Sequence, residues 1–512
     1  PARRADVIAH LSAAQSGGRA VADAVAAGVD RWTGDWASER RALCMSTVRD
    51  ADDEDERVAD RLQCLERRLG RIDATLHVFT DALEPAIVAR ATAIIDDLPP
   101  PAGCAALARP ATSEAQKEIW KPSMRDIVQA QLALNAGKPA EAERLADAVV
   151  ERSRETRQKE PLAVALLLRG QAELARGNFA QGRATLREAI LASAEVDEDG
   201  FVVDAWFNII SALAFRERRL DHELEEAIFG AELAVRSLPI DDPDTDSRRA
   251  ALAYWIGSVR LLQGKSDEAL DQLHQAILEW TRAGADKHRL EIAGVENSLG
   301  MAHSYRAEWA PARRYFDRAL ATWEKTGNSV NAGVTIGNIG SLLAGQRLDA
   351  EAEVELRRSI AALEAAGDAG RPSIADSLIG LAMLEVRLGR CDEADVLLAR
   401  ARALATEIHG AESGMVGVTM TGTGECQLAR GRVREAVATL ERARTLVAEF
   451  PATMTLQEEA DFALARALWQ AGDRRRALEL AASARTGLAA IPGARATLRD
   501  VDAWLVDHPP RH

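Results

Sequence analysis

Aromatic residues are scarce in this chain of 512 residues: they make up 4% of it, and only three are tyrosines. Runs of β-branched residues are also rare, whereas alanine and leucine dominate, as they do in helical proteins. No stretch approaches the roughly 18 consecutive apolar residues that a membrane-spanning helix needs. The sequence therefore predicts an all-α protein without direct membrane insertion.

Positive charge is in deficit as well. The chain has 64 Lys and Arg residues against 79 Asp and Glu residues, which gives a net charge of −15. Nucleic-acid binding requires Lys and Arg clustered on one surface, and no basic stripe occurs here. We therefore expect no nucleic-acid partner, and we interpret the acidity as an aid to the solubility of an extended surface.

Complete catalytic motifs are also missing. The residues Gly264-Lys265-Ser266 match the end of a phosphate-binding loop, but the earlier glycine that this loop requires is replaced by Val259. No spacing of His and Cys suggests zinc, and no pair of carboxylates stands out as a catalytic dyad. The sequence predicts no catalytic residue, no metal and no cofactor. A cryptic hydrolase or nucleotide-binding protein is the less favoured alternative.

The sequence contains a repeated frame of small residues. In one copy, Gly257 precedes a turn residue, Gly264, which is followed by Ala269, Leu273 and Ala276. Nine copies fit this frame, at steps of 40 to 46 residues. The position of Ala269 in the frame falls at Ala142, Gly182, Glu223, Ala269, Ala312, Ala352, Ala394, Ala436 and Ala477.

Helix packing explains such a frame. Each copy is predicted to be a helix, a tight turn and a second helix, and two helices cross closely only where small residues lie at the crossing. A glycine in the turn lets the backbone leave the first helix with a positive φ angle. Because no copy buries its apolar face alone, the copies are expected to stack into a solenoid.

The frame resembles the tetratricopeptide repeat, most clearly at Leu299-Gly300, Ala312, Phe316 and Ala319. The resemblance covers roughly residues 121–490. The standard unit has about 34 residues, and the longer copies here are similar to those of kinesin light chains and of bacterial signalling scaffolds. The resemblance implies a tetratricopeptide-like α-solenoid of about nine hairpins that binds a protein or peptide.

Composition suggests four parts. Prolines punctuate the stretch around residues 99–122, and such stretches mark boundaries. A solenoid also needs a terminal helix that covers its open end. We therefore expect a helical N-terminal module at residues 1–104, a linker at 105–121, the solenoid at 122–490, and a capping helix and tail at 491–512.

Five cysteines are distributed over the chain. Cys44 and Cys64 flank an acidic loop and would lie level with each other in an antiparallel helical hairpin, so a disulfide between them is geometrically permitted. The alternative is that both are buried thiols that pack as small apolar residues. Cys391 and Cys426 fall in different repeats and are predicted to be thiols in the core.

A second resemblance concerns the N-terminal module. Trp36, Arg40, Cys44 and Thr47 are followed by Arg61-x2-Cys64-Leu65-x2-Arg68, and then by Leu98-Pro99 with Cys104 shortly after. This pattern resembles the region between kinase domain and repeats in bacterial serine/threonine protein kinases of the myxobacterial type.

The second resemblance implies a signalling role. In that family a kinase domain precedes the repeats, often with a membrane span between them, and none of the kinase motifs occurs here. This chain is therefore expected not to be an enzyme, but the non-catalytic, C-terminal scaffold or sensor part of such a kinase. The alternative is a stand-alone adaptor or chaperone-like protein.

The two alternatives differ in localisation. A stand-alone protein would be cytoplasmic and would keep free thiols, whereas a kinase with a membrane span permits an extracytoplasmic location where a Cys44–Cys64 disulfide persists. The sequence names neither the bound partner nor the oligomeric state.

The first resemblance also implies a binding site, because the first helix of each unit lines the concave groove of such arrays. Asparagines in this groove are similar to those of kinesin light chains that hold a peptide backbone, since an amide offers both a donor and an acceptor. For Asn297 and Asn338, a groove role and packing within the solenoid are both open, and for the other candidates packing is the default interpretation. The candidate groove residues are Asn208, Tyr254, Ser258, Asn297, Met301, Tyr305, Asn338, Ser341, Met383 and Arg387.

Overall fold

The structure is a computed structural model of the chain, and it describes residues 2–12, 18–49, 61, 65, 68–69, 72, 76, 91–92, 95–96, 98, 100–104, 114–196, 198–238, 243–448 and 455–509. Within these ranges every regular element is a helix, which confirms the predicted all-α class.

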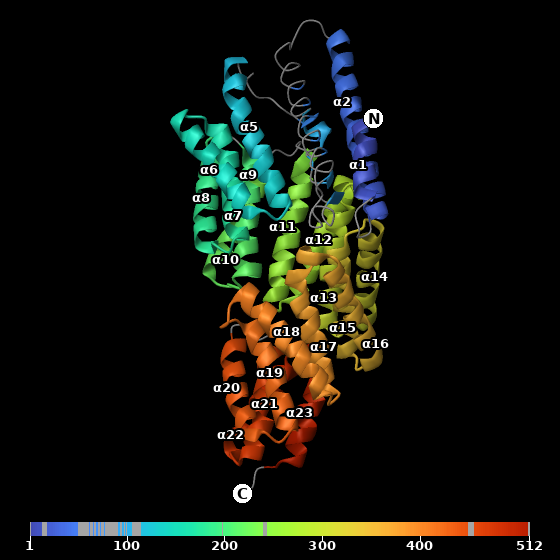
Figure 1. The fold of residues 1–512 in the computed structure, drawn as a ribbon, viewed down its shortest axis with the longest axis vertical. Helices are drawn as coiled ribbons and strands as arrows, with labels where there is room; N and C mark the ends of the chain where they lie inside the picture. Colours follow the sequence, from blue (N-terminus) through green and yellow to red (C-terminus); the bar gives the residue numbers. More distant parts are fainter. Residues whose placement is uncertain are drawn as a thin grey trace. The chain divides into compact units, whose positions relative to one another are not determined.

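The N-terminal helices are α1 (Ala2–Ser12) and α2 (Gly18–Arg49), and a short turn, η1 (Pro101–Cys104), follows. Nine helical hairpins then occupy the described part of the chain (Figure 1). Their helices are α5 (Glu114–Asn135) with α6 (Pro139–Glu155), α7 (Lys159–Ala175) with α8 (Phe179–Ala194), α9 (Asp199–Ser211) with α10 (His222–Ser237), α11 (Pro243–Leu262) with α12 (Ser266–Gly284), α13 (Arg289–Tyr305) with α14 (Trp309–Lys325), α15 (Ser329–Gly345) with α16 (Asp349–Ala365), α17 (Arg371–Arg387) with α18 (Cys391–His409), α19 (Gly414–Ala429) with α20 (Val433–Val447), and α21 (Leu456–Ala471) with α22 (Arg474–Ala489). The last helix is α23 (Arg495–Asp507).

The chain divides into two compact units. Unit 1 comprises Pro1–Ile256, His274–Ile292 and Lys325–Asn328, and unit 2 comprises Gly257–Leu273, Ala293–Glu324 and Ser329–His512. Each unit is described by itself below.

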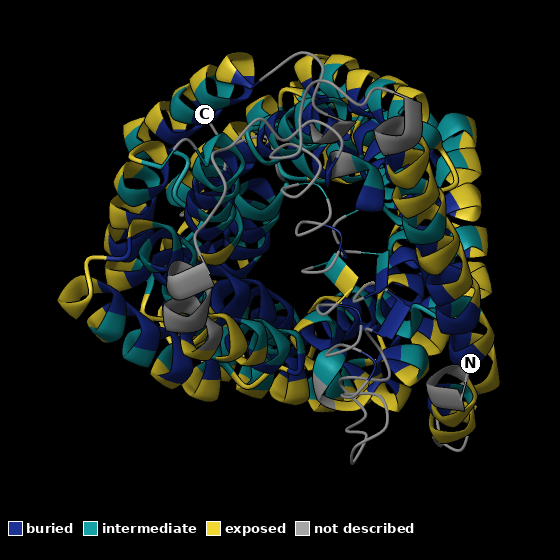
Figure 2. Cartoon of the chain, turned by 90° about the horizontal axis from the view of Figure 1, so that it is seen from above, coloured by how far each residue is buried: buried dark blue, intermediate teal, exposed yellow. Residues whose placement is uncertain are grey.

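Small residues at the helix crossings are buried, as the frame predicts. Ala269, Ala312 and Ala352 have no exposed surface. At Gly300 an added Cβ atom would lie 2.5 Å from the ring of Phe316 on the paired helix. In Figure 2, buried residues lie mainly where helices face one another, and exposed residues lie on the outer helix faces. Close approach of paired helices therefore requires the small residues, which confirms the register of the frame.

The turns between paired helices share one backbone conformation. All nine turn positions of the frame have a positive φ angle in the described residues, and six of them are glycines. The other three are Arg218, Ala307 and Arg347, with φ angles of 52°, 59° and 63°. The turn geometry is thus fixed by the hairpin even where the sequence lacks glycine.

The least regular hairpin is formed by α9 and α10. A π-helical turn, η2 (Ala212–Arg216), extends α9. Glu223 replaces the usual small residue and is not buried. Its carboxylate instead accepts hydrogen bonds from Arg183 at 3.2 Å and from Arg187 at 2.6 Å. Glu223 is thus held by ion pairs to the preceding hairpin, and the close approach of α9 and α10 occurs at Gly230, where an added Cβ atom would lie 2.6 Å from the ring of Trp206.

The expected linker differs from the structure at its C-terminal end. Helix α5 begins at Glu114, inside the segment expected to be a linker, and it contains Pro122. The residues from Glu114 to Ile119 are mostly good helix formers, so the helix extends on the N-terminal side of the proline.

The N-terminal part of unit 1 has its own core, in which Val25, Trp32 and Ile95 are buried. Trp36 donates a hydrogen bond from Nε1 to the carbonyl of Leu65 at 2.8 Å. The carboxylate of Asp96 lies 3.2 Å from both Arg31 and Arg289, which ties this module to residues that follow α12.

A larger side chain at a helix crossing tests the register of the repeat frame. Replacing Ala312 with leucine should lower the free energy of unfolding by about 1–3 kcal/mol, because the larger side chain must displace buried neighbours. Ala310 is exposed on the same helix, so Ala310→Leu is the matched control and should change stability by less than about 0.5 kcal/mol. If urea unfolding showed the same decrease in the free energy of unfolding for both variants, the register of the frame would be wrong.

Candidate functional site

The first helices of the hairpins in unit 2 expose one recurring position. The crossing residues Gly300, Gly340 and Gly424 pack against the paired helix. The next residue is rotated by about 100° around the helix axis, away from that contact. On α13, α15, α17, α19 and α21 none of the residues at this position is buried, whereas Ser258, which follows Gly257 on α11, is buried. We call the surface that the unburied residues define the A face, and they are Met301, Ser341, Met383, Glu425 and Arg466.

Two asparagines on this surface lie next to each other. Asn338 on α15 donates from Nδ2 to Oδ1 of Asn297 on α13 at 3.0 Å. Thr335 donates from Oγ1 to the same oxygen at 3.1 Å. Both asparagines are half-buried. Two of the candidate groove residues are therefore in contact, and the Oδ1 atom of Asn297 accepts two internal hydrogen bonds.

One hydrogen-bonding group on each of these two side-chain amides makes no hydrogen bond within the described residues. Within the described residues, the Nδ2 group of Asn297 and the Oδ1 atom of Asn338 make no hydrogen bond. One donor and one acceptor thus remain on neighbouring helices at a half-buried place, where water competes less than on an open surface.

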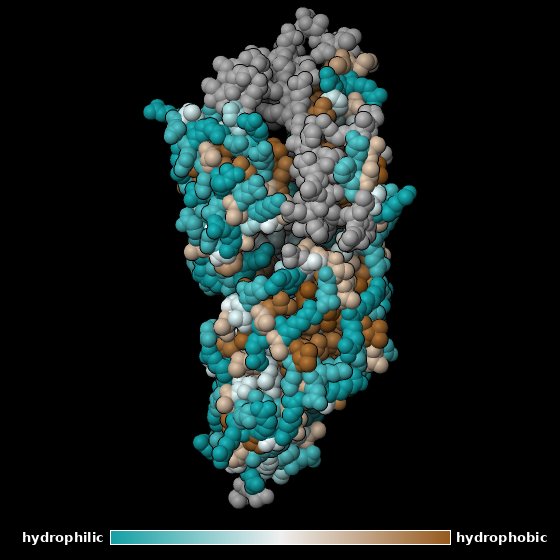
Figure 3. All heavy atoms as spheres, in the orientation of Figure 1, coloured by the Kyte–Doolittle hydropathy of each residue, from teal (hydrophilic) through white to brown (hydrophobic). Residues whose placement is uncertain are grey.

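Around the asparagines the A face is apolar and adaptable. Met301 and Met383 are half-buried, and the sulfur of Met383 packs against Gly422 on α19. Tyr305 is 37% exposed and Ser341 is exposed. Figure 3 shows hydrophobic residues gathered in the region of α13, α17 and α18. Methionine side chains fit irregular partners because they have three rotatable bonds and a polarizable sulfur.

Arg387 lies at the C-terminal end of α17 and has internal partners. It forms an ion pair with Asp349 at 2.8 Å and donates to the carbonyl of Ala344 at 3.3 Å. Burial lowers the pKa of the guanidinium below its ordinary value. Arg387 therefore holds neighbouring hairpins together and positions the edge of the A face.

The other candidate residues have packing environments. Asn208 donates to the carbonyl of Asp204 in its own helix at 2.8 Å. The ring of Tyr254 lies 5.7 Å from Trp255 and 6.0 Å from Trp280, within an aromatic cluster of unit 1. Ser258 is buried, and its hydroxyl has no hydrogen-bond partner among the described residues.

Charged residues of the A face were not found from the sequence. Arg466 donates a hydrogen bond to Glu425, and its guanidinium lies 5.2 Å from the centre of the Phe462 ring. Both charged residues follow a crossing residue, as Met301 does, so the repeat frame contains the signal that identifies them. The A face is thus amide-rich and apolar on α13 to α17, and charged on α19 and α21.

Glu459 lies one turn before Phe462 on α21. Burial raises the pKa of its carboxyl to about 7, with further contributions from the charges of Glu425 and Glu458. The hydroxyl of Thr455 donates to this carboxyl at 2.8 Å. Glu459 therefore keeps its proton at pH values at which an ordinary glutamate is ionised.

This shift predicts a pH dependence of stability. In the unfolded chain a glutamate ionises near pH 4.5, so between pH 4.5 and 7 the folded state holds a proton that the unfolded state has released. Stability should fall as the pH rises through this window. From about pH 5 to about pH 8 the wild type should lose about 1–2 kcal/mol more than Glu459→Gln, a value reduced for partial solvent exposure. Identical pH profiles in urea unfolding would contradict the assignment.

The C-terminal segment contacts earlier hairpins of unit 2. Asp500 on α23 accepts a hydrogen bond from Arg347 in the turn between α15 and α16. An added Cβ atom at Gly493 would lie 3.0 Å from the carbonyl oxygen of Tyr305. On its other side α23 packs Trp504 against Trp469, with ring centres 5.7 Å apart. Helix α23 thus packs against the end of α21 and the turn after α15, and the turn that precedes α23 lies against Tyr305.

The cysteines differ from the expectations. Cys44 is a thiol on an exposed part of α2, so it is neither bridged to Cys64 nor buried. Cys64 lies outside the described residues, and Cys104 is disulfide-bonded. Cys391 and Cys426 were expected to be thiols, but they form a disulfide, because α18 and α19 bring their Cα atoms within 5.4 Å. Residues in successive repeats can therefore be closer than their place in the repeat pattern suggests.

Stacked hairpins, small residues at the crossings and a recurring exposed position define an α-solenoid of the kind that binds other proteins. Models of the tetratricopeptide repeat match residues 127–198, 297–326, 373–449 and 459–483. The chain therefore carries tetratricopeptide repeats in these residues, which confirms this part of the prediction and supports a role in protein–protein interaction. No curated protein sequence matches the chain.

Solved structures with a similar fold are distant in sequence. A Rap protein complexed with competence and sporulation factor is 12% identical, with a TM-score of 0.49, and the match covers 76% of this chain and 99% of that one. The apo form of RapI is 12% identical, with a TM-score of 0.46 and coverage of 71% and 97%. Yeast Tom70 is 15% identical, with a TM-score of 0.42 and coverage of 89% and 82%.

A membrane-spanning helix and a metal site are both absent from the described residues. Among the helices that the structure describes, none combines the length and hydrophobicity needed to cross a bilayer. Groups of three or more His, Cys, Asp or Glu side chains that could hold a metal ion do not occur in the described part of the chain.

Proposed function

We propose that the A face of unit 2 binds an extended peptide segment of a partner protein. The observation that carries this proposal is the amide pair of Asn297 and Asn338, whose shared hydrogen bond leaves one donor and one acceptor unused. A peptide backbone presents alternating donors and acceptors, so it can satisfy both atoms at once.

The surroundings of the amides support an extended ligand. Met301 on α13 and Met383 on α17 occupy the same position of the frame, and α15, which carries Asn338, comes between these two first helices. Because the methionines can repack, they accept apolar side chains of different shapes. The asparagines would bind the backbone, and the methionines would bind side chains. Affinity would then depend on the amides more than on the partner's sequence.

Asn297→Asp is the sharpest test of the amide pair. The substitution keeps the oxygen that accepts from Asn338 and Thr335, but it removes the Nδ2 donor. Peptides selected from a random display library on the full chain should bind this variant about 5- to 100-fold more weakly, because one or two hydrogen bonds of roughly 0.5–1.5 kcal/mol each are lost. Isothermal titration calorimetry measures the change.

Asn208→Ala is the matched control. Its amide bonds only to its own helix, so its removal should leave the affinity unchanged. A thermal melt of each variant separates loss of binding from loss of folding. If Asn297→Asp and Asn208→Ala bind the selected peptides equally well, the amide pair does not recognise the ligand.

We further propose that this scaffold is the non-catalytic part of a bacterial serine/threonine kinase. The support is the N-terminal pattern around Trp36 and Arg40, where the guanidinium lies 5.1 Å from the centre of the Trp36 ring. Residues 1–104 would then be the kinase-proximal module, and residues 122–490 would be the sensor. The genomic sequence upstream of Pro1 tests this proposal: a kinase domain supports it, whereas a start codon favours a stand-alone adaptor.

A further inference from the structure

The disulfide between Cys391 and Cys426 joins two successive hairpins. Cys391 is the first residue of α18, and Cys426 lies on α19, 35 residues later. The bond therefore links the second helix of one repeat to the first helix of the next, at a junction that is also held by hydrogen bonds from Arg402 to Thr419 and Thr423.

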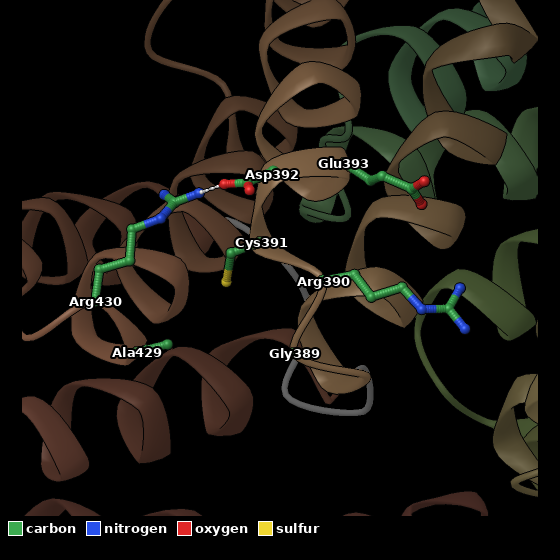
Figure 4. Close-up of a pocket in the computed structure, with 7 residues that line it drawn as sticks. All are labelled: Gly389, Arg390, Cys391, Asp392, Glu393, Ala429 and Arg430. Carbon is green, nitrogen blue, oxygen red and sulfur yellow. Dashed lines mark hydrogen bonds and ion pairs between the residues drawn. The ribbon is translucent and has the colours of Figure 1, made fainter.

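The two sulfurs have different access to solvent. Cys391 is half-buried and lines a cavity of about 410 Å³, whereas Cys426 is fully buried and is not among the residues that line it. Figure 4 shows the sulfur of Cys391 pointing into the space on the side of Ala429. The other lining residues are Gly389, Arg390, Asp392, Glu393 and Arg430.

Charge at the cavity does not exclude an anionic reagent. Arg430 pairs with Asp392 at 2.8 Å and with Asp395 at 2.6 Å. Arg390 pairs with Glu353 at 2.9 Å on the other side. The arginines thus balance most of the carboxylates near Cys391, and a thiolate meets little net repulsion there.

We propose that Cys391 is a site of thiol–disulfide exchange with a small thiol of the glutathione class. The thiolate attacks Sγ of Cys391 and forms a mixed disulfide, and the Cys391–Cys426 bond breaks. The electron pair passes to Cys426, which leaves as a thiolate and takes a proton from water. A second small-molecule thiolate then attacks the small-molecule sulfur of the mixed disulfide, which releases the Cys391 thiolate and the disulfide of the two small-molecule thiols.

Solvent access determines which of the two sulfurs the small thiolate attacks. A reagent reaches the sulfur of Cys391 through the cavity, whereas attack on Cys426 requires the helices to separate. Modification is therefore confined to one of the two cysteines. The junction between the α17–α18 and α19–α20 hairpins thereby becomes sensitive to the thiol concentration around the protein.

Mapping of the mixed disulfide tests the proposal. The oxidised full chain carrying Cys44→Ser, which removes the background thiol, is treated with reduced glutathione, quenched in acid and digested for mass spectrometry. Glutathione should be found on Cys391 at least about tenfold more often than on Cys426, because exchange follows exposure. An equal distribution, a preference for Cys426, or no adduct until denaturant is added would overturn the proposal.

Alkylation of single thiols gives a second measurement in the same background. Cys426→Ala leaves Cys391 as a thiol, and Cys391→Ala leaves Cys426. Iodoacetamide should react with Cys391 at least about tenfold faster than with Cys426, since only Cys391 reaches the cavity. Equal alkylation rates in variants with matching circular dichroism spectra would contradict the proposal. Mass-spectrometric mapping of the mixed disulfide requires neither variant, so it tests the proposal even if a variant does not fold.

Discussion

Replacing Phe316 with alanine should lower the free energy of unfolding by about 3–5 kcal/mol, the largest single effect that we expect. Phe316 is 1% exposed and is among the largest fully buried side chains of the described residues. Its ring packs against Gly300, where no side chain is available to fill the resulting cavity. Since repeats contact mainly their neighbours, the loss should appear first in the hairpin of α13 and α14.

Hydrogen exchange locates the effect of Phe316→Ala. Amide protection should fall in α13 and α14 before it falls in α5 to α8, because local opening in repeat proteins is set by the nearest interfaces. Phe229 is 59% exposed on α10, so Phe229→Ala is the matched control, and it should change stability by less than about 0.5 kcal/mol. Similar losses for the two variants would show that Phe316 does not fill the crossing.

Removal of the Cys391–Cys426 disulfide should have the second largest effect. The bond closes a loop with a sequence separation of 35, so the double variant Cys391→Ala/Cys426→Ala should lose about 3–4 kcal/mol by the chain-entropy estimate. Urea unfolding of the oxidised proteins measures the difference. Cys44→Ser, at an exposed position, is the control and should have little effect. A double variant as stable as the wild type would show that the disulfide adds no constraint.

The repeat frame could be predicted because a close helix crossing accepts only small residues, and these residues recur at fixed spacing in the sequence. Ala269, Ala312 and Ala477 are fully buried at the expected position. The turn after each first helix was predicted even at Ala307 and Arg347, where no glycine is present. At these two turns the hairpin imposes a positive φ angle on a residue that disfavours it, which is a cost that the surrounding packing must offset.

Side-chain contacts between repeats, whether successive or distant, could not be predicted in this way. The frame places Glu425 and Arg466 on the first helices, but their pairing depends on how far successive hairpins rotate. The bond from Arg347 to Asp500 joins residues 153 positions apart, and no period in the sequence indicates it. Asn297 and Asn338 were each predicted as groove candidates from the resemblance, but the hydrogen bond between them was not predicted.

The pairing of the cysteines could not be predicted from the sequence either. A simple antiparallel hairpin placed Cys44 level with Cys64, but the orientation of a side chain around the helix axis decides whether it faces inward. Cys44 faces solvent. Cys391 and Cys426 occupy unrelated positions of the frame, and the stacking of two hairpins brings them together.

Hydrogen exchange of the full chain, with and without a peptide selected from a random display library, tests the central claim most directly. We predict added protection in α13, α15 and α17 around Asn297, Asn338 and Met383, and the loss of this protection in Asn297→Asp. Protection confined to the second helices α14, α16 and α18, or unchanged in the variant, would contradict the claim that the A face binds the partner.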